Sequence, residues 1–472
     1  MIDTNIGVSE FGMVGLGTMG RNLLLNIADH GRSVSGYDLG QDKVDLLASE
    51  SQGRPTLGFT DAAAFAKSLR RPRCITMLVP AGSPVDAVIQ SFKPYLEPGD
   101  LIIDGGNSYF KDTDRRIAEL APTGIAFFGM GISGGESGAR HGPSMMAGGS
   151  EADYDKVRGV LELVAAKADD GRPCVARVGN GSAGHYVKMV HNGIEYGIMQ
   201  LIAETYDLMK RSWGFSNEQL AEIYGTWAKS DIGGFLLEIT ETVLKKKDGE
   251  TGKYLVDLIR DEAKEKGTGK WTSQDAMDLR VSVPSIDAAV CARELSDLKA
   301  ERVAASKTLA TQAVQGEKDV ARLREALSIA MITAYTQGMA QLRVASGEYN
   351  YGVQMEPVAA IWRAGCIIRS VLLKNIMDAY TANADLPNLL VDPGIQETVK
   401  QRIGSLRWLA NQAVATHVPM PCFMASLAYI DAYSSERLPA NLIQAQRDFF
   451  GTHTYERIDK PGVFHTEWAE GA

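Results

Sequence analysis

The sequence predicts an α/β domain of the doubly wound type, followed by a larger all-helical domain and a C-terminal tail. Short apolar runs alternate with helical patterns up to about residue 180, and from there to about residue 440 the periodicity is almost entirely helical. From Arg447 onward the chain is rich in aromatic side chains, is broken by glycine and proline and lacks helical periodicity. Repeated strand–turn–helix units build a parallel sheet covered by helices on both faces. We therefore divide the chain into residues 1–180, 181–440 and 441–472.

Four short runs in the first part are predicted strands. Phe11–Val14 precedes a glycine-rich turn, and residues 33–38 follow the helical pattern of residues 21–30. Residues 74–79 and Leu101–Asp104 are apolar runs of the kind that buried parallel strands have. Turn residues follow each run, so strands and helices alternate along the chain.

Composition is typical of an ordinary globular protein. The 472 residues are 45% hydrophobic and 23% charged, and the net charge of −9 argues against binding to nucleic acid or to an anionic membrane. The five cysteines are scattered without a C-x-x-C pair, which is typical of a reducing compartment without disulfides or a zinc cluster. The sequence has neither a signal-peptide pattern nor an apolar run of transmembrane length, so a cytoplasmic protein is expected.

The glycine-rich turn after the first predicted strand indicates a Rossmann-type dinucleotide site. Its G-x-G-x-x-G spacing follows a strand and opens a helix, and in that context glycines let the backbone approach a pyrophosphate. The positive end of the helix faces that charge, and a glycine turn without a ligand is the alternative. The expected cofactor contacts in this turn are Gly15, Leu16, Gly17, Thr18, Met19 and Gly20.

The end of the second predicted strand bears on the choice of cofactor. Asp38 can accept hydrogen bonds from the adenosine ribose hydroxyls, and it would repel a 2′-phosphate. The next residues are Leu39 and Gly40, so no arginine stands beside the carboxylate, and the nearest cations that could offset its charge are Lys43 and Arg32. These residues favour NAD as the cofactor, with NADP as the alternative.

An apolar segment, residues 187–209, carries four polar side chains at helical spacing. They stand at i, i+3, i+4 and i+7, and they belong to Lys188, His191, Asn192 and Glu195. One helix would place all of them on one face, where polar groups are costly unless they bond to each other or to a ligand. A solvated face with a charge pair is the alternative for an isolated helix. The dinucleotide site upstream favours an active site.

Several blocks, in order along nearly the whole chain, resemble the decarboxylating 6-phosphogluconate dehydrogenases. The blocks are residues 103–108, 131–136, 142–144, 188–197, 266–272, 442–448 and 453–455. The resemblance implies a cytoplasmic homodimer of the pentose phosphate pathway. It also implies oxidation of 6-phosphogluconate to ribulose 5-phosphate and CO2, normally with NADP.

The resemblance assigns roles to particular residues. It implies that Lys188 is the general base and Glu195 the general acid. Substrate contacts are implied for Asn107, Ser133, Gly134, Gly135, His191, Asn192, Tyr196, Lys266, Thr268 and Arg293, and, in the partner subunit's site, for Arg447 and His453 of the tail. Cofactor contacts are implied for Met19, Val79, Pro80, Ala81, Asn107 and Glu136.

The chain departs from the family pattern at positions that include the cofactor site. Residues 38–40 read Asp-Leu-Gly where the family usually has Asn-Arg-Ser/Thr, so the arginine that binds the 2′-phosphate is missing. This departure agrees with the independent argument for NAD. Gly17 is commonly Ala in the family, Pro80 replaces a usual Lys, and Ile198 replaces an Asp. The sequence offers no functional reason for Ile198.

The implied chemistry needs a base and an acid together. Oxidation at C3 makes the carboxylate β to a ketone, loss of CO2 leaves an enediol, and protonation at C1 completes the reaction. The sequence shows no carboxylate cluster for a metal ion, so Lys188 would take the hydroxyl proton and return it to the enol oxygen, which requires a lowered pKa. Glu195 would be protonated, which requires a raised pKa. Candidate phosphate clamps are Lys266, Arg293 and Arg447. Residues 131–135, which include Ser133, are interpreted as a glycine-rich loop that presents backbone N–H groups to a carboxylate, with a plain turn as the alternative.

Two other functions are compatible with parts of this pattern. A non-decarboxylating β-hydroxyacid dehydrogenase would share the dinucleotide domain and a catalytic lysine, but Glu195, the phosphate clamps and the long tail argue against it. A nucleotide-sensing binding protein without catalysis is disfavoured by the intact pair of Lys188 and Glu195.

Overall fold

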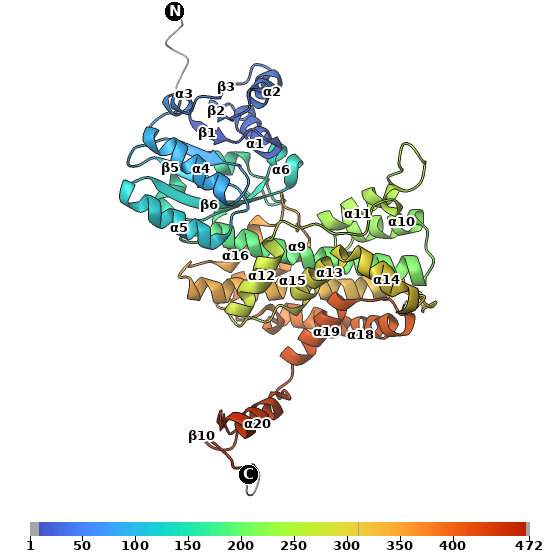
Figure 1. The fold of residues 1–472 in the computed structure, drawn as a ribbon. Coiled ribbons are helices and arrows are strands. Elements are labelled where there is room, and N and C mark those ends of the chain that lie inside the picture. The colour runs from blue at the N-terminus through green and yellow to red at the C-terminus, as the bar shows by residue number, and fades with distance from the viewer. Residues whose placement is uncertain (1–8, 310, 469–472) are drawn as a thin grey trace, which may run out of the picture. The chain divides into compact units, whose positions relative to one another are not determined.

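The computed structural model describes residues 9–309 and 311–468. The chain divides into two compact units, with the boundary between Ser426 and Leu427. The first unit begins with a part built around a sheet and continues with a helical part (Figure 1). The boundary predicted at residue 180 falls between the last strand of the sheet and the first long helix.

An eight-stranded sheet, counted over the described residues, forms the core of the first part. Its order is β3-β2-β1-β4-β5-β6-β7-β8, and neighbouring strands are parallel except for the antiparallel pair β6 and β7. The strands are β1 (Phe11–Val14), β2 (Val34–Tyr37), β3 (Thr56–Phe59), β4 (Cys74–Met77), β5 (Leu101–Asp104), β6 (Ala126–Ser133), β7 (Ser144–Ala147) and β8 (Val175–Arg177). The doubly wound α/β class is confirmed, with one antiparallel step that the sequence did not predict.

Helices cover both faces of this sheet, and each face has its own apolar core. Leu24 of α1 and Leu161 of α8 pack on one face with Met130 of β6, whereas Phe65 of α3 and Ile89 of α4 pack on the other face. The helices are α1 (Thr18–Asp29), α2 (Gln41–Ser51), α3 (Ala62–Lys67), α4 (Ser83–Phe92), α5 (Phe110–Leu120), α6 (Gly135–His141), α7 (Glu151–Asp155) and α8 (Arg158–Val164).

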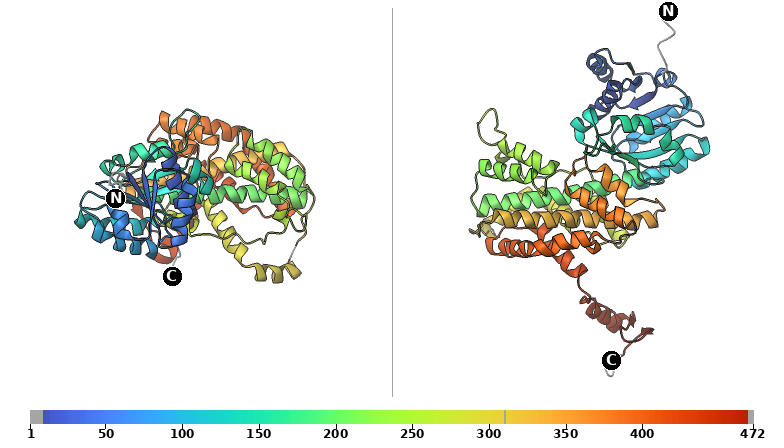
Figure 2. Two further views of the ribbon diagram at one scale, coloured as in Figure 1. Left: turned by 90° about the horizontal axis from the view of Figure 1, so that it is seen from above. Right: turned by 180° about the vertical axis from the view of Figure 1, so that it is seen from behind.

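Two long helices, α9 and α15, run side by side through the helical part (Figures 1 and 2). At their crossing, a Cβ on Gly197 would lie 3.4 Å from Cβ of Ala334, and a Cβ on Gly338 would crowd Ile194. The helices are α9 (Ala183–Asp207), α10 (Asn217–Ala228), α11 (Phe235–Lys245), α12 (Thr268–Asp278), α13 (Pro284–Asp297), α14 (Lys299–Leu309), α15 (Val320–Glu348), α16 (Met355–Ile361), α17 (Leu372–Ala382), α18 (Pro393–Thr416) and α19 (Pro421–Tyr433). Among the described residues, no helix is both long and apolar enough to cross a bilayer.

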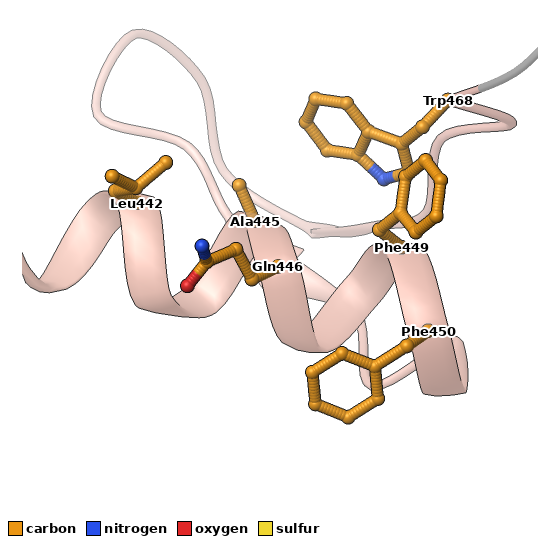
Figure 3. Close-up of a pocket in the computed structure, with 6 residues that line it drawn as sticks. All are labelled: Leu442, Ala445, Gln446, Phe449, Phe450 and Trp468. Carbon is orange, nitrogen blue, oxygen red and sulfur yellow. The ribbon is translucent and has the colours of Figure 1, made fainter.

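The second unit contains a helix that the sequence analysis missed. Helix α20 (Ala440–Gly451) includes the first residues of a segment that we predicted to lack helical periodicity. An apolar stripe of Leu442, Ala445 and Phe449 explains the helix, because this spacing lines one face. The stripe borders a pocket of about 480 Å³, and Figure 3 shows Trp468 beside Phe449 there. A hairpin of β9 (Tyr455–Glu456) and β10 (Val463–Phe464) follows.

A buried carboxylate on α9 holds the beginning of α19. Oxygens of Glu204 accept hydrogen bonds from the backbone N–H groups of Cys422 at 2.9 Å and Phe423 at 3.1 Å, and from Gln200 Nε2 at 3.0 Å. These bonds satisfy N–H groups that a helix start leaves without partners. Burial nevertheless outweighs them and raises the pKa of Glu204 to about 7.

We predict that Glu204 makes stability fall with rising pH. Its folded pKa lies above the ordinary value of 4.5, so its contribution is complete below pH 4.5 and is lost as pH rises through about 7. The loss should be on the order of 2–3 kcal/mol. Calorimetric unfolding from pH 5 to 8 should show a flatter profile for Glu204→Gln, whereas Glu222→Gln, at an exposed position on α10, should follow the wild type. Equal slopes in all three proteins would contradict the assignment.

Candidate active site

The glycine-rich turn between β1 and α1 has the geometry of a dinucleotide-binding turn. Gly15 has φ +92°, which favours glycine, and a Cβ on Gly20 would overlap the carbonyl oxygen of Gly15. Gly17 is the N-cap of α1, and of the described residues none comes within 4 Å of a Cβ placed there. The turn thus presents bare backbone and the positive end of α1 to open space.

A cavity of about 630 Å³ lies beside this turn. Predicted cofactor residues that line it are Gly15, Gly17, Asp38, Leu39, Val79 and Pro80. Its far wall was not predicted and comes from α4, with Pro84, Ala87, Val88 and Ser91. The predicted contacts in the turn 79–82 could have indicated this wall, because the turn leads from β4 into α4. The size, the bare turn and the carboxylate at the rim suit the adenosine half of a nicotinamide dinucleotide.

Asp38 lines the cavity and also holds two backbone segments of this site in place. One carboxylate oxygen accepts from the backbone N–H of Leu16 at 2.8 Å, and the other accepts from the N–H of Gly40 at 2.9 Å. The Leu39 side chain beside it is 85% exposed. Each carboxylate oxygen keeps a further acceptor site for a ribose hydroxyl.

The two cations expected near Asp38 behave differently. Lys43 lines the cavity, with its ammonium 3.5 Å from the carboxylate of Asp42. Arg32 pairs with Glu10 at 3.1 Å, before β2 begins, so the strand separates it from the cavity. The expectation that Arg32 could offset the charge of Asp38 was therefore wrong.

Helix α9 lies directly against β6 and β7, because glycines remove the side chains between them. A Cβ on Gly129 would overlap the ring of His185, and a Cβ on Gly131 would overlap Cβ of Lys188. On the helix, a Cβ on Gly184 would overlap the carbonyl oxygen of Gly129. This approach buries Lys188 at the end of the sheet.

The predicted polar stripe is present on α9. Nδ1 of His191 lies 3.4 Å from Nζ of Lys188, 3.1 Å from Oδ1 of Asn192 and 3.8 Å from Oε2 of Glu195. On the other edge of the ring, Nε2 of His191 lies 3.2 Å from Oγ of Ser133. One buried imidazole therefore connects the amine, the amide, the carboxyl group and the end of β6.

Burial shifts the titration of this stripe in opposite directions. It lowers the pKa of Lys188 from its ordinary value of 10.5, against the effect of the Glu195 carboxylate. It raises the pKa of Glu195 from 4.5, against the effects of Lys188 and Arg293. Burial and the Lys188 ammonium hold the pKa of His191 well below 6.5, so the ring is neutral at pH 7. Burial therefore shifts Lys188 toward its neutral amine and Glu195 toward its protonated form.

The first turn of α12 and one residue of α13 complete this side of the site. Nδ2 of Asn192 donates to Oγ1 of Thr268 at 2.9 Å, and a Cβ on Gly269 would overlap the ring of Tyr196. The guanidinium of Arg293 lies 3.5 Å from the centre of that ring. Lys266, just before α12, is exposed.

The segment around Ser133 is partly strand, where the sequence analysis treated it as a glycine-rich loop. Residues 131–133 pair with β7, and the turn begins at Gly134 and Gly135, with φ of +117° and +62°. Glycine is needed at the first position, because a Cβ on Gly134 would lie 2.5 Å from the carbonyl oxygen of Gly365. Oγ of Ser133 accepts from the N–H of Ile367 at 3.3 Å. The turn around residues 365–367 was not predicted, because its role depends on this tertiary contact.

Other predicted contacts are placed as follows. Both oxygens of the buried Asp104 hold the turn after β5, by accepting from Gly106 N–H at 3.0 Å and Ser108 Oγ at 2.6 Å, and Asn107 projects from that turn exposed to solvent. Thr18 and Glu136 are exposed and Met19 is partly buried. Arg447 and His453 lie in the second unit.

The departure at Ile198 has a packing basis. The side chain is 1% exposed and lies among apolar groups that include Leu237, Met331 and Tyr335. A carboxylate would be costly there without a partner. The described part of the chain shows no group of three acidic, histidine or cysteine side chains arranged for a metal ion.

A dinucleotide-binding sheet with buried polar side chains on an adjoining helix is typical of nicotinamide-dependent dehydrogenases, and this chain is one of them. The family model described as the NAD binding domain of 6-phosphogluconate dehydrogenase matches residues 10–179. The model of the 6-phosphogluconate dehydrogenase C-terminal domain matches residues 184–468. The chain belongs to the 6-phosphogluconate dehydrogenase family.

Named relatives match along nearly the full length. The Salmonella typhimurium protein named 6-phosphogluconate dehydrogenase, decarboxylating, is 49% identical over 465 residues, which are 98% of this chain and 99% of the relative. The Bacillus subtilis protein named as the NADP(+)-dependent, decarboxylating enzyme is 48% identical over 97% and 99% of the two chains. The Plasmodium falciparum 6-phosphogluconate dehydrogenase, solved alone, with its cofactor NADP+ and with its substrate 6-phosphogluconate, superposes with a TM-score of 0.94 at 39% identity, covering 97% of this chain and 100% of the other.

We predict that Gly131→Ala lowers turnover by about a hundredfold, because the added methyl group displaces the Lys188 side chain from its seat on β6. Dinucleotide affinity should change little, since the cavity beside α1 is not touched. Gly159→Ala is the matched control, because of the described residues none comes within 4 Å of the new Cβ. Steady-state kinetics and fluorescence titration with the dinucleotide measure both effects. Equal turnover of the two variants would contradict the packing argument.

Proposed function

We propose that this protein oxidises and decarboxylates 6-phosphogluconate to ribulose 5-phosphate and CO2, in the cytoplasm, as an enzyme of the pentose phosphate pathway. The opposite pKa shifts of Lys188 and Glu195 on one face of α9 are the observation that carries the proposal. The names of the relatives and the substrate complex of the Plasmodium protein support it.

Lys188 is the proposed base of the first step. Its neutral amine accepts the proton of the 3-hydroxyl group, and the nicotinamide cofactor supplies the hydride acceptor. The resulting ammonium then returns the proton to the carbonyl oxygen as CO2 leaves. Because His191 is neutral, it adds no second positive charge beside Lys188 and can hold the amine by a hydrogen bond.

Glu195 is the proposed acid of the last step. It lies one turn of α9 beyond His191, and its side chain is 20% exposed, so it reaches the open side of the site. The protonated carboxyl group delivers its proton to C1 of the enediol. Arg293 and Lys266 are the proposed partners of the substrate's phosphate group, together with Arg447 and His453 of the other subunit. The remaining proposed contacts are Asn107, Ser133, Gly134, Gly135, His191, Asn192, Tyr196 and Thr268.

NAD is the proposed cofactor, although two relatives are described with NADP. The argument rests on the lining of the cavity, where Asp38 is acidic and Leu39 is uncharged. A 2′-phosphate placed there would meet the carboxylate of Asp38, and the ammonium of Lys43 already pairs with Asp42. The proposed contacts also include Leu16, Thr18, Met19, Gly20, Gly40, Ala81, Asn107 and Glu136.

A homodimer is proposed, in which the tail of each subunit completes the partner subunit's site. Within the tail, Leu442, Phe449, Phe450 and Trp468 are 45–71% exposed around one pocket (Figure 3). An apolar surface of this kind needs a covering partner in water. We also propose that residues 1–180 bind the dinucleotide, that residues 181–440 bind the substrate and form the dimer, and that residues 441–472 form the tail.

We predict that Lys188→Ala loses turnover by several orders of magnitude and keeps its dinucleotide affinity, because the base is removed without touching the cavity. For the wild type, CO2 released per reduced dinucleotide should be close to one. A ratio near zero would favour the runner-up function, a non-decarboxylating dehydrogenase. Binding of the dinucleotide without any turnover in the wild type would favour a sensing protein.

We predict a higher kcat/KM with NAD than with NADP for the wild type. Leu39→Arg should raise kcat/KM for NADP by about tenfold or more, because a guanidinium can bind the 2′-phosphate. The Leu39 side chain is 85% exposed, so the larger arginine side chain fits without displacing a neighbour. Leu46→Arg adds the same charge elsewhere on α2 and is the control. Wild-type preference for NADP would overturn the cofactor proposal, and an unchanged ratio in Leu39→Arg would overturn the placement of the 2′ position.

A further inference from the structure

The tail is organised around a single buried carboxylate, Asp448. One oxygen accepts from the N–H of Thr454 at 2.9 Å and from Nδ1 of His465 at 2.8 Å. The other accepts from the N–H of Thr466 at 3.0 Å and from Nε1 of Trp468 at 2.8 Å. Although the tail is short, the Asp448 side chain is fully shielded from water by these partners. Helix α20 and both ends of the hairpin are therefore held by one side chain.

Two polar residues of α20 share a face with Asp448. Gln444, Arg447, Asp448 and Gly451 stand at i, i+3, i+4 and i+7, which is one stripe of a helix. Arg447 donates to Oε1 of Gln444 at 3.2 Å, and Gln444 in turn donates to the carbonyl oxygen of Thr454. The residue that follows His453 is thus bound from both sides, at its N–H by Asp448 and at its carbonyl by Gln444.

The ring of His453 packs against Gly451. A Cβ on Gly451 would lie 2.6 Å from Nε2 and 2.7 Å from Cδ2 of His453, so the imidazole lies directly over the helix backbone. Phe450 meets the same ring edge-on, with centroids 6.0 Å apart. Because Arg447 and Gly451 are one turn apart, the guanidinium and the imidazole lie on the same face of α20.

We infer that Asp448 and Gly451 are positioning residues that hold Arg447 and His453 on one face of α20 as a preformed anion-binding pair. The inference rests on the proposed function, in which these two side chains bind the phosphate group of the substrate in the partner subunit. Preforming the pair removes the entropy cost of ordering two side chains when the phosphate binds. Without the hydrogen bonds to Asp448, the side chains of Arg447 and His453 would have to be ordered each time the phosphate binds.

Gly451→Ala is the sharpest test. Alanine favours a helix by about 1 kcal/mol over glycine, so α20 should persist while the methyl group displaces His453. KM for 6-phosphogluconate should rise by about tenfold or more, with kcat and KM for the dinucleotide within about twofold. Gly347→Ala, in α15, is the control, because of the described residues none comes within 4 Å of the added Cβ.

Asp448→Asn provides a second, independent variant, because it removes the negative charge and one of the two acceptor oxygens at this position. KM for the sugar phosphate should rise in the same selective way, and Asp459→Asn, which loses an exposed pair with Arg457 in the same tail, should not change it. Size-exclusion chromatography checks that the assembly is kept. An unchanged KM in both Gly451→Ala and Asp448→Asn would overturn the inference.

Combination with His453→Ala separates positioning from other effects. If Gly451 acts through His453, Gly451→Ala should have no further effect on KM in a His453→Ala background. Additive effects would overturn the inference. Should Arg447→Ala and His453→Ala themselves leave KM unchanged, the proposed role of the tail fails. If they raise KM and Gly451→Ala does not, only the positioning inference fails.

Discussion

Helix α9 rests on strand β6 at backbone distance because Gly129, Gly131 and Gly184 leave no side chains between the two elements. The same contact places Lys188 at the end of the sheet and removes it from water. Its lowered pKa, the neutral His191 and the raised pKa of Glu195 all follow from that burial. The electrostatics of the site are therefore a consequence of packing between a glycine-bearing strand and one helix.

The tail uses the same helical spacing for a different purpose. In α9 the stripe at i, i+3, i+4 and i+7 is largely buried by the surrounding domain, whereas in α20 only Asp448 of the stripe is buried, and Arg447 and Gly451 are exposed. The four hydrogen bonds that Asp448 accepts join α20 to the segments before and after the hairpin. A small element can keep a defined shape in this way without being large enough to bury a core.

Much of the fold could be predicted from local sequence, and the failures have a common cause. The bounds of β1 and β5 agree with the prediction, because each is an apolar run that ends at a glycine-containing turn. The end of strand β6, residues 131–133, was taken for part of a loop, since Gly131 serves the contact with α9 and carries no strand signal of its own. Helix α20 was missed because its stripe stands beside a segment broken by glycine and proline.

The part of the site that lies on the single helix α9 could be predicted from the sequence. Spacing alone placed the four polar groups of α9 on one face, and the distances around His191 agree with that prediction. Their partners Ser133 and Thr268 are 58 and 76 residues away from the groups they contact, so only the fold brings them together. The α4 wall of the cofactor cavity needed the fold for the same reason.

The double hydrogen bond of Asp38 to the N–H groups of Leu16 and Gly40 limits how cofactor preference can drift. Replacement of Asp38 by asparagine would break one of these two bonds and would loosen either the glycine-rich turn or the start of α2, since asparagine offers only one acceptor oxygen. A cation introduced at the neighbouring exposed Leu39 would leave both bonds of Asp38 intact. Cofactor selectivity can therefore be altered by adding charge beside Asp38 while its carboxylate is retained.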